Sequence, residues 1–275
     1  ASAVCLSALL RGATPSWLAV GVAVAVLFGF FFQLRVADEH KDNEDDTKYR
    51  PERPVPRGLV TLSELRIVAI VVGVAQVGLT AWLDARLIVL LLAVWGWLAI
   101  MTKEFFVPAW LKKRPVIYMV SHMAIMPLID LYATACDWWP AGYALHEGFG
   151  LTLGAFLLLS LVNGSAIEIA RKSWAPEQER EGVETYSKLW KPGPAGVAVM
   201  AIILVGLALA AFINVRSQAG VWFLGGLVLV SAWAAWTAID YAGTPTETTV
   251  KRLETGTAVF VMANYLLLGV LPLMA

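Results

Sequence analysis

Long apolar runs, separated by short polar segments, repeat along the whole chain. A run near 20 residues spans the hydrocarbon core of a bilayer as a helix, which satisfies its own backbone hydrogen bonds there. Strands of a membrane barrel would instead alternate polar and apolar residues. We therefore predict an all-α, polytopic membrane bundle in a single domain, 1–275, with about nine transmembrane helices. These are a short or truncated one at 1–10, then 14–34, 61–83, 87–102, 116–135, 149–170, 195–214, 220–241 and 255–273.

Composition and charge support a membrane protein and predict its orientation. Hydrophobic residues make up 59% of the chain and charged residues 15%, and the mean hydropathy is +0.68. The loops after the second, fourth, sixth and eighth predicted helices hold all of the 21 Lys and Arg residues except Arg11, Arg86 and Arg216. Basic loops stay on the cytoplasmic side, so we expect a multi-pass protein of the inner (cytoplasmic) membrane, surrounded by lipid and without a nucleic-acid partner.

An acidic segment follows the second predicted helix, within residues 35–58. Asp38, Asp42 and Asp46 are four residues apart, a spacing that stacks side chains on one helix face, and Asp45 lies beside them. Stacked carboxylates repel unless a cation lies among them. Mg²⁺ takes one or two carboxylates and completes its shell with water and substrate phosphates. We therefore predict that these four aspartates bind Mg²⁺; the alternative is a solvated acidic loop.

Basic residues lie close to the acidic segment and in the third cytoplasmic loop. Arg53 follows the aspartates, and Lys113 and Arg114 belong to the run Lys-Lys-Arg at 112–114. Such cations can bind a diphosphate through charge-assisted hydrogen bonds. For the 112–114 run the alternative is membrane topology alone.

A second polar segment begins at the end of the sixth predicted helix. Asn163 and Glu168 fall inside an apolar run, where an ionisable group is costly and is a functional candidate. Glu168 and Lys172 are also spaced to form a helix-stabilising ion pair. Because this loop comes four spans after the first polar loop, we predict two pseudo-repeated halves, about 1–135 and 136–275, that share a cytoplasmic site.

Two polar residues stand out in the fifth predicted helix. His122 and Asp130 have apolar neighbours on both sides. Either residue lines a cavity or satisfies a polar group of another helix. We favour a cavity for His122, which is nearer the cytoplasmic end, and list it with the substrate-binding candidates.

These motifs resemble the UbiA superfamily of intramembrane prenyltransferases. The family pattern NDxxDxxxD, followed by an RPLPSG-like segment, is similar to LRVADEHKD at 34–42 followed by RPVPRG at 53–58. Two departures are clear: Arg35 stands at the family's first aspartate, and Glu168, Arg171 and Lys172 replace the aspartates of the second motif. The Gly182–Thr185 end of that second motif is kept.

The resemblance implies transfer of an isoprenyl group from a polyprenyl diphosphate to a membrane-accessible acceptor, aromatic or phosphorylated, with Mg²⁺ assisting departure of the diphosphate. It implies that the catalytic residues are Asp38, Asp42, Asn163 and Glu168. The implied substrate-binding residues are Arg35, Arg53, Lys113, Arg114, His122, Arg171 and Lys172. The alternative function is a transporter or a non-catalytic scaffold with an acidic cytoplasmic cavity.

Overall fold

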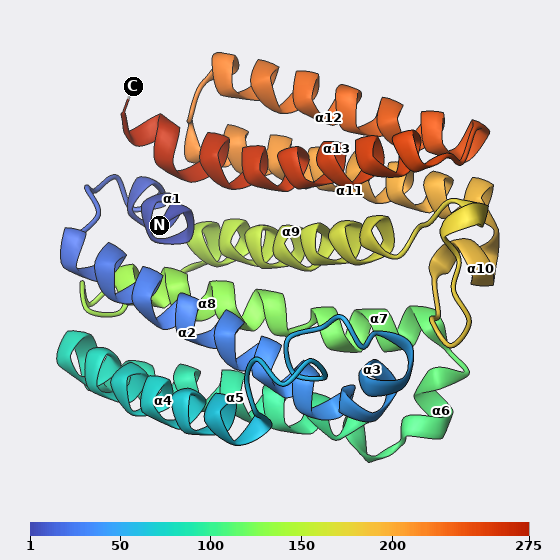
Figure 1. The fold of residues 1–275 in the computed structure, drawn as a ribbon. Coiled ribbons are helices and arrows are strands. Elements are labelled where there is room, and N and C mark those ends of the chain that lie inside the picture. The colour runs from blue at the N-terminus through green and yellow to red at the C-terminus, as the bar shows by residue number, and fades with distance from the viewer. Residues whose placement is uncertain (275) are drawn as a thin grey trace. The chain divides into compact units, whose positions relative to one another are not determined.

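The computed structural model describes residues 1–274, and within that range the chain is helical with no β-strand (Figure 1). Among the described residues, seven helical stretches are long and apolar enough to cross a membrane. This confirms the prediction of an all-α integral membrane protein. The stretches are Trp17–Lys41, Leu62–Thr102, Pro115–Trp138, Gly148–Arg171, Pro192–Ser217, Val221–Gly243 and Glu247–Leu273.

The predicted count of nine spans is not confirmed, although one of the seven stretches contains two helices. The first helix, α1 (Ser2–Leu10), has only nine residues. The stretch Leu62–Thr102 combines α4 (Leu62–Asp84), η1 (Ala85–Leu87) and α5 (Ile88–Thr102). A Cβ on Gly73, midway along α4, would lie 3.5 Å from the Trp95 ring, midway along α5. The two helices therefore form an antiparallel hairpin, and this stretch holds both of the helices predicted for it.

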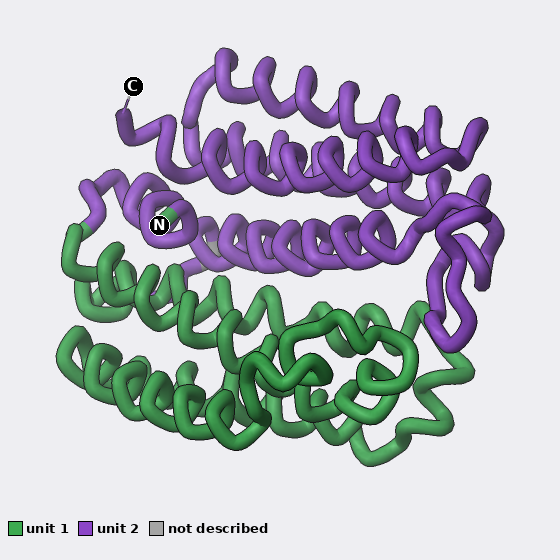
Figure 2. The backbone as a smooth tube through the Cα atoms, viewed as in Figure 1, with its two compact units in different colours: residues 1, 16–143 green, residues 2–15, 144–275 purple. Residues whose placement is uncertain are grey.

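The chain divides into two compact units (Figure 2). Unit 1 contains residues 1 and 16–143, and unit 2 contains residues 2–15 and 144–275. The predicted organisation as a single domain of two repeated halves stays a prediction.

Unit 1 begins with α2 (Trp17–Lys41), whose N-cap Ser16 accepts a hydrogen bond from the Ala19 amide at 3.4 Å. Buried polar contacts join α2 and α8 to α4: the Gln76 side chain donates to the Val26 carbonyl at 2.9 Å, and the Thr80 and Tyr132 hydroxyls are 2.7 Å apart. The remaining elements of this unit are α3 (Asn43–Tyr49), η2 (Glu104–Phe106), α6 (Pro108–Lys112), α7 (Pro115–Met123) and α8 (Ile125–Trp138).

The predicted helix 116–135 is divided at Ala124 into α7 and α8. Pro127 explains the break, because proline has no amide hydrogen to donate to the carbonyl four residues earlier and its ring clashes with that carbonyl. The carbonyl concerned is that of Met123, where α7 ends.

Unit 2 consists of closely packed helices, with α11, α12 and α13 lying side by side (Figure 1). At Gly196 of α11 an added Cβ would lie 2.7 Å from the Ala238 carbonyl oxygen of α12, so only glycine permits this approach. The elements of this unit are α1, α9 (Glu147–Arg171), η3 (Pro176–Gln178), α10 (Tyr186–Trp190), α11 (Pro192–Ser217), α12 (Val221–Gly243), α13 (Glu247–Tyr265), η4 (Leu266–Val270) and η5 (Leu271–Leu273).

Candidate functional site

The first motif lies on the last two turns of α2, which continues to Lys41 rather than ending at the predicted boundary, residue 34. Two backbone hydrogen bonds preserve the four-residue spacing: the Asp42 amide donates to the Asp38 carbonyl at 2.9 Å, and the Asp46 amide donates to the Asp42 carbonyl at 2.8 Å. Asp42, at φ −94° and ψ 3°, separates α2 from α3. Asp38 is exposed and Asp42 is half-buried.

Asp46 and Asp45 differ in environment although they are neighbours on α3. Asp45 is exposed. Asp46 is buried, with 3% of its surface accessible, and its carboxylate forms ion pairs with Arg53 and, at 3.7 Å, with Arg50. The structure therefore brings the predicted metal ligand Asp46 together with the predicted diphosphate ligand Arg53.

Arg35, the residue at the family's first aspartate position, forms an ion pair with Glu39 one turn later on α2. The Glu39 side chain is 7% exposed, whereas that of Arg35 is 51% exposed. The guanidinium therefore remains accessible at the end of the apolar part of α2.

The carboxylates of the first motif suit Mg²⁺ whose coordination shell is completed by substrate phosphates and water. Within residues 1–274 no three His, Cys, Asp or Glu side chains are grouped to hold a metal ion. Mg²⁺ does not require such a group, because it commonly takes one or two carboxylates, several waters and phosphate oxygens. Asp38 and Asp42, one helical turn apart, supply this number of carboxylates.

A polar cluster that the sequence did not reveal lies beside the motif. The Lys41 ammonium contacts Glu104 Oε1 at 2.6 Å and the Tyr118 hydroxyl at 2.7 Å. The Tyr118 hydroxyl in turn donates to Glu104 Oε1 at 3.1 Å. The only sequence signal is that Glu104 is acidic within an otherwise basic loop, since its two partners are far away along the chain.

Glu104 is ionised in this cluster at neutral pH. Burial alone would raise the pKa of Glu104, but the hydrogen bond and charge of Lys41, with the Tyr118 hydroxyl, outweigh burial and hold the pKa below its usual value. The contact therefore stabilises the fold above the unfolded-state pKa and is lost as the pH falls through the lowered one.

His122 lies on α7 next to this cluster. Its ring stacks on that of Tyr118, with centroids 4.1 Å apart and an interplanar angle of 12°, and its Nδ1 is 2.8 Å from the Tyr118 carbonyl oxygen. Asp130 is buried on α8, with 5% of its surface accessible. The predicted cations Lys113 and Arg114 are exposed between α6 and α7, and the Arg114 guanidinium lies 4.2 Å from the Trp110 ring centroid.

In unit 2, the second polar segment begins in the last turns of α9. Glu168 forms ion pairs with Arg171 at 2.8 Å and Lys172 at 2.7 Å. The helix-stabilising pair considered from the sequence is thus present. Asn163 is buried, and its side-chain oxygen accepts a hydrogen bond from Asn264 of α13 at 2.9 Å. The catalytic roles predicted for Asn163 and Glu168 stay predictions.

The loop after α9 is held by a hydroxyl network. Glu179 accepts hydrogen bonds from Thr185, at 2.7 and 2.8 Å, and from Ser187, at 2.7 Å. The Trp174 amide donates to Ser187 Oγ at 2.8 Å, and the Tyr241 hydroxyl of α12 donates to the Trp174 carbonyl at 3.0 Å. These contacts fix the loop against α12.

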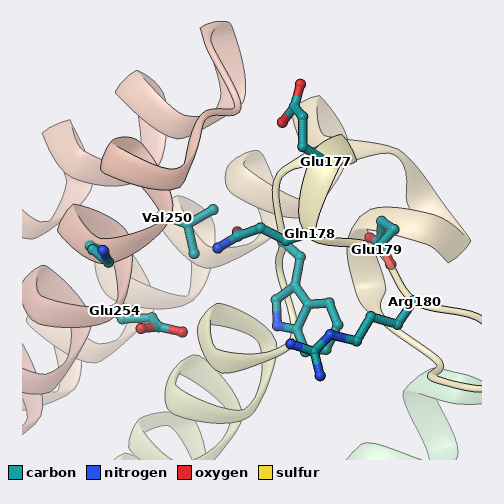
Figure 3. Close-up of a pocket in the computed structure, with 8 residues that line it drawn as sticks. Glu177, Gln178, Glu179, Arg180, Val250 and Glu254 are labelled. Carbon is teal, nitrogen blue, oxygen red and sulfur yellow. The ribbon is translucent and has the colours of Figure 1, made fainter. Parts of the chain in front are cut away.

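The same loop forms one wall of a pocket of about 410 Å³, and α13 forms the other. Figure 3 shows the Gln178 side chain extending toward Val250 of α13, with Glu254 one turn further along that helix and Glu177 pointing away. The pocket lining combines carboxylates and cations. Its lining residues are Trp174, Glu177, Gln178, Glu179, Arg180, Val250, Lys251 and Glu254.

Comparison with known proteins places this chain in a family. Residues 1–265 match the model of the UbiA prenyltransferase family. A solved structure described as that of a digeranylgeranylglyceryl phosphate synthase in membranes is similar in fold, with a TM-score of 0.66 and 14% sequence identity, over 97% of this chain and 90% of that one. No curated protein matches the chain. Because the family model covers nearly the whole sequence, the chain belongs to the UbiA prenyltransferase family.

Proposed function

We propose that this protein transfers an isoprenyl group from a polyprenyl diphosphate to a membrane-accessible acceptor, with Mg²⁺ assisting departure of the diphosphate. The observation that carries the proposal is the pair Asp38 and Asp42, one turn apart at the polar end of an apolar helix, in a chain of the UbiA family. The distribution of Lys and Arg supports a site on the cytoplasmic side of the inner membrane.

The donor diphosphate is proposed to meet Mg²⁺ at Asp38 and Asp42, with Asp45 and Asp46 as further members of the acidic set. When bound, Mg²⁺ would neutralise the negative charge that develops on the departing diphosphate. Arg35, Arg53, Lys113 and Arg114 are proposed to bind the same diphosphate through charge-assisted hydrogen bonds. The Asp46 ion pair would orient the Arg53 guanidinium for that contact.

The second segment is proposed to bind a second anionic group. Arg171 and Lys172 share Glu168 as an ion-pair partner, and the Arg171 side chain is 65% exposed. This set carries a net positive charge where the family's second motif is acidic. An anion, a phosphate of the donor or a phosphate on the acceptor, fits that charge.

The test uses the full chain in lipid nanodiscs, with farnesyl or geranylgeranyl diphosphate and a mixed membrane-lipid extract as the source of acceptor. We expect Mg²⁺-dependent release of diphosphate that is lost in Asp38→Ala and in Asp42→Ala, because either change removes one of the two carboxylates that hold Mg²⁺ against the substrate phosphates. The control is Glu44→Ala, an exposed acidic residue on α3 outside the predicted set. Full activity in both aspartate variants would refute the assignment.

A further inference from the structure

We infer that Glu104 is a positioning residue, which holds the Lys41 ammonium away from the Asp38–Asp42 face and thereby sets how tightly that face binds a divalent cation. The inference rests on the proposed function and deepens it. The groups concerned, Lys41, Glu104 and Tyr118, all lie in unit 1.

Lys41 lies close enough to the Asp38–Asp42 face to compete with a bound metal cation. Lys41 lies three residues after Asp38 and directly before Asp42, and side chains three apart on a helix are neighbours. An ion pair with this spacing forms elsewhere in the chain, where Arg171 contacts Glu168, three residues earlier on α9, at 2.8 Å. A Lys41 side chain without another partner would therefore reach the acidic face and compete with a metal cation.

The structure gives Lys41 two other partners. Its ammonium lies 2.6 Å from Glu104 Oε1 and 2.7 Å from the Tyr118 hydroxyl, and Tyr118 also donates to Glu104 at 3.1 Å. The three groups form a closed triangle that fixes the direction of the lysine side chain. Arg35 behaves similarly, since it contacts Glu39. Both cations that flank Asp38 on α2 thus contact a carboxylate outside the Asp38–Asp42 pair.

The backbone around Glu104 is strained. Glu104, Phe105 and Phe106 have φ values of 48°, 53° and 60°, in the left-handed region that residues with a side chain rarely adopt. Such strain persists only where the surroundings impose it, and it gathers at functional sites. Here Phe105 packs edge-on against Trp97 and His122, with ring centroids 5.4 and 5.8 Å apart.

This turn buries the Glu104 side chain, although an ion pair with Lys41 could form with an exposed carboxylate. Glu104 is 7% exposed, and its second oxygen, Oε2, is buried without a hydrogen-bond partner in the described part of the chain. A buried carboxylate oxygen without a partner is unfavourable. A surface carboxylate would pair with Lys41 at a smaller cost, so we attribute the arrangement to control of the lysine.

The test measures metal binding directly and does not depend on turnover. Binding of Mn²⁺ to the full chain in nanodiscs is followed by electron paramagnetic resonance, with and without inorganic diphosphate. Glu104→Gln removes the negative charge that attracts Lys41, and a cation that moves beside the site weakens Mn²⁺ binding roughly tenfold. In the double variant Glu104→Gln/Lys41→Met the competing cation is gone, and the affinity returns to about the wild-type value.

A purely structural role for Glu104 gives a different pattern, because removing Lys41 would not repair a damaged turn. A double variant as weak as Glu104→Gln would therefore overturn the inference, as would wild-type affinity in Glu104→Gln. In Tyr118→Phe the charge pair is retained, so the affinity stays within about twofold, and a tenfold loss there would assign the role to Tyr118. If wild-type protein binds no Mn²⁺ even with diphosphate, the proposed function fails together with the inference. If only Glu104→Gln behaves unexpectedly, the proposed function survives.

Discussion

The ion pairs of Asp46 predict a local loss of stability that can be measured within the acidic segment. Asp46→Asn keeps the shape of the side chain but removes the charge that faces Arg50 and Arg53. The Asp46 carboxylate is 4% exposed, and the two guanidinium-bearing side chains are 28% and 26% exposed. Asp45→Asn is a matched control, because Asp45 is the adjacent residue on the same helix and is exposed.

The magnitude follows from this burial. Breaking a fully buried ion pair costs about 3–5 kcal/mol, whereas exposed pairs contribute about 0–1 kcal/mol. With a buried carboxylate and arginines that are partly open to solvent, we expect Asp46→Asn to lower the free energy of local unfolding by about 2 kcal/mol. That corresponds to a roughly 30-fold larger population of the opened segment, since about 1.4 kcal/mol is a factor of ten.

The assay is limited proteolysis of the nanodisc-embedded protein with trypsin, which can cut after Lys48 and Arg57 in this segment. When opening and closing are fast compared with cleavage, the rate follows the population of the open form. We expect cleavage about 30 times faster in Asp46→Asn and unchanged in Asp45→Asn. Equal rates for the two variants would show that the Asp46 ion pairs do not hold the segment.

Two further predictions concern packing and orientation. Gly196→Ala should destabilise unit 2 by about 1–3 kcal/mol and lower the midpoint of thermal unfolding, because the new methyl group meets the Ala238 carbonyl. Gly154→Ala is the control, since nothing lies within 4 Å of its added Cβ. Equal midpoints for the two variants would contradict the close packing at Gly196. The native cysteines Cys5 and Cys136 are buried, so a cysteine introduced at exposed Glu44 should react with a membrane-impermeant maleimide only from the cytoplasmic side of oriented vesicles; labelling from the other side alone would reverse the topology.

The helices could be predicted from the sequence because their signal is local. The run before Arg35 is apolar enough to span a bilayer, and helix boundaries were mostly found within a few residues. The polar residues after residue 34 predict the end of this helix, but α2 continues to Lys41 because Glu, His and Lys are tolerated in helices. Pro127 explains the division between α7 and α8 through the hydrogen bond that it cannot form.

The candidate site was only partly accessible to sequence reasoning. The four-residue spacing of Asp38 and Asp42 is a local property and was recognisable. The burial of Asp46 against Arg50 and Arg53 depends on the path of the chain after α3, which spacing does not determine. The Lys41–Glu104–Tyr118 cluster joins three distant segments through a left-handed turn without glycine, and no residue pattern predicts that backbone.

The most direct test of prenyl transfer is the identity of the product. The protein in nanodiscs is incubated with a polyprenyl diphosphate labelled in its isoprenyl chain and with a membrane-lipid extract. The lipids are then analysed by mass spectrometry, with and without a chelator of divalent cations. We expect a labelled lipid heavier by one isoprenyl group, formed only when Mg²⁺ is present. Recovery of the label solely as the free isoprenyl alcohol, or equal product formation with the chelator, would contradict it.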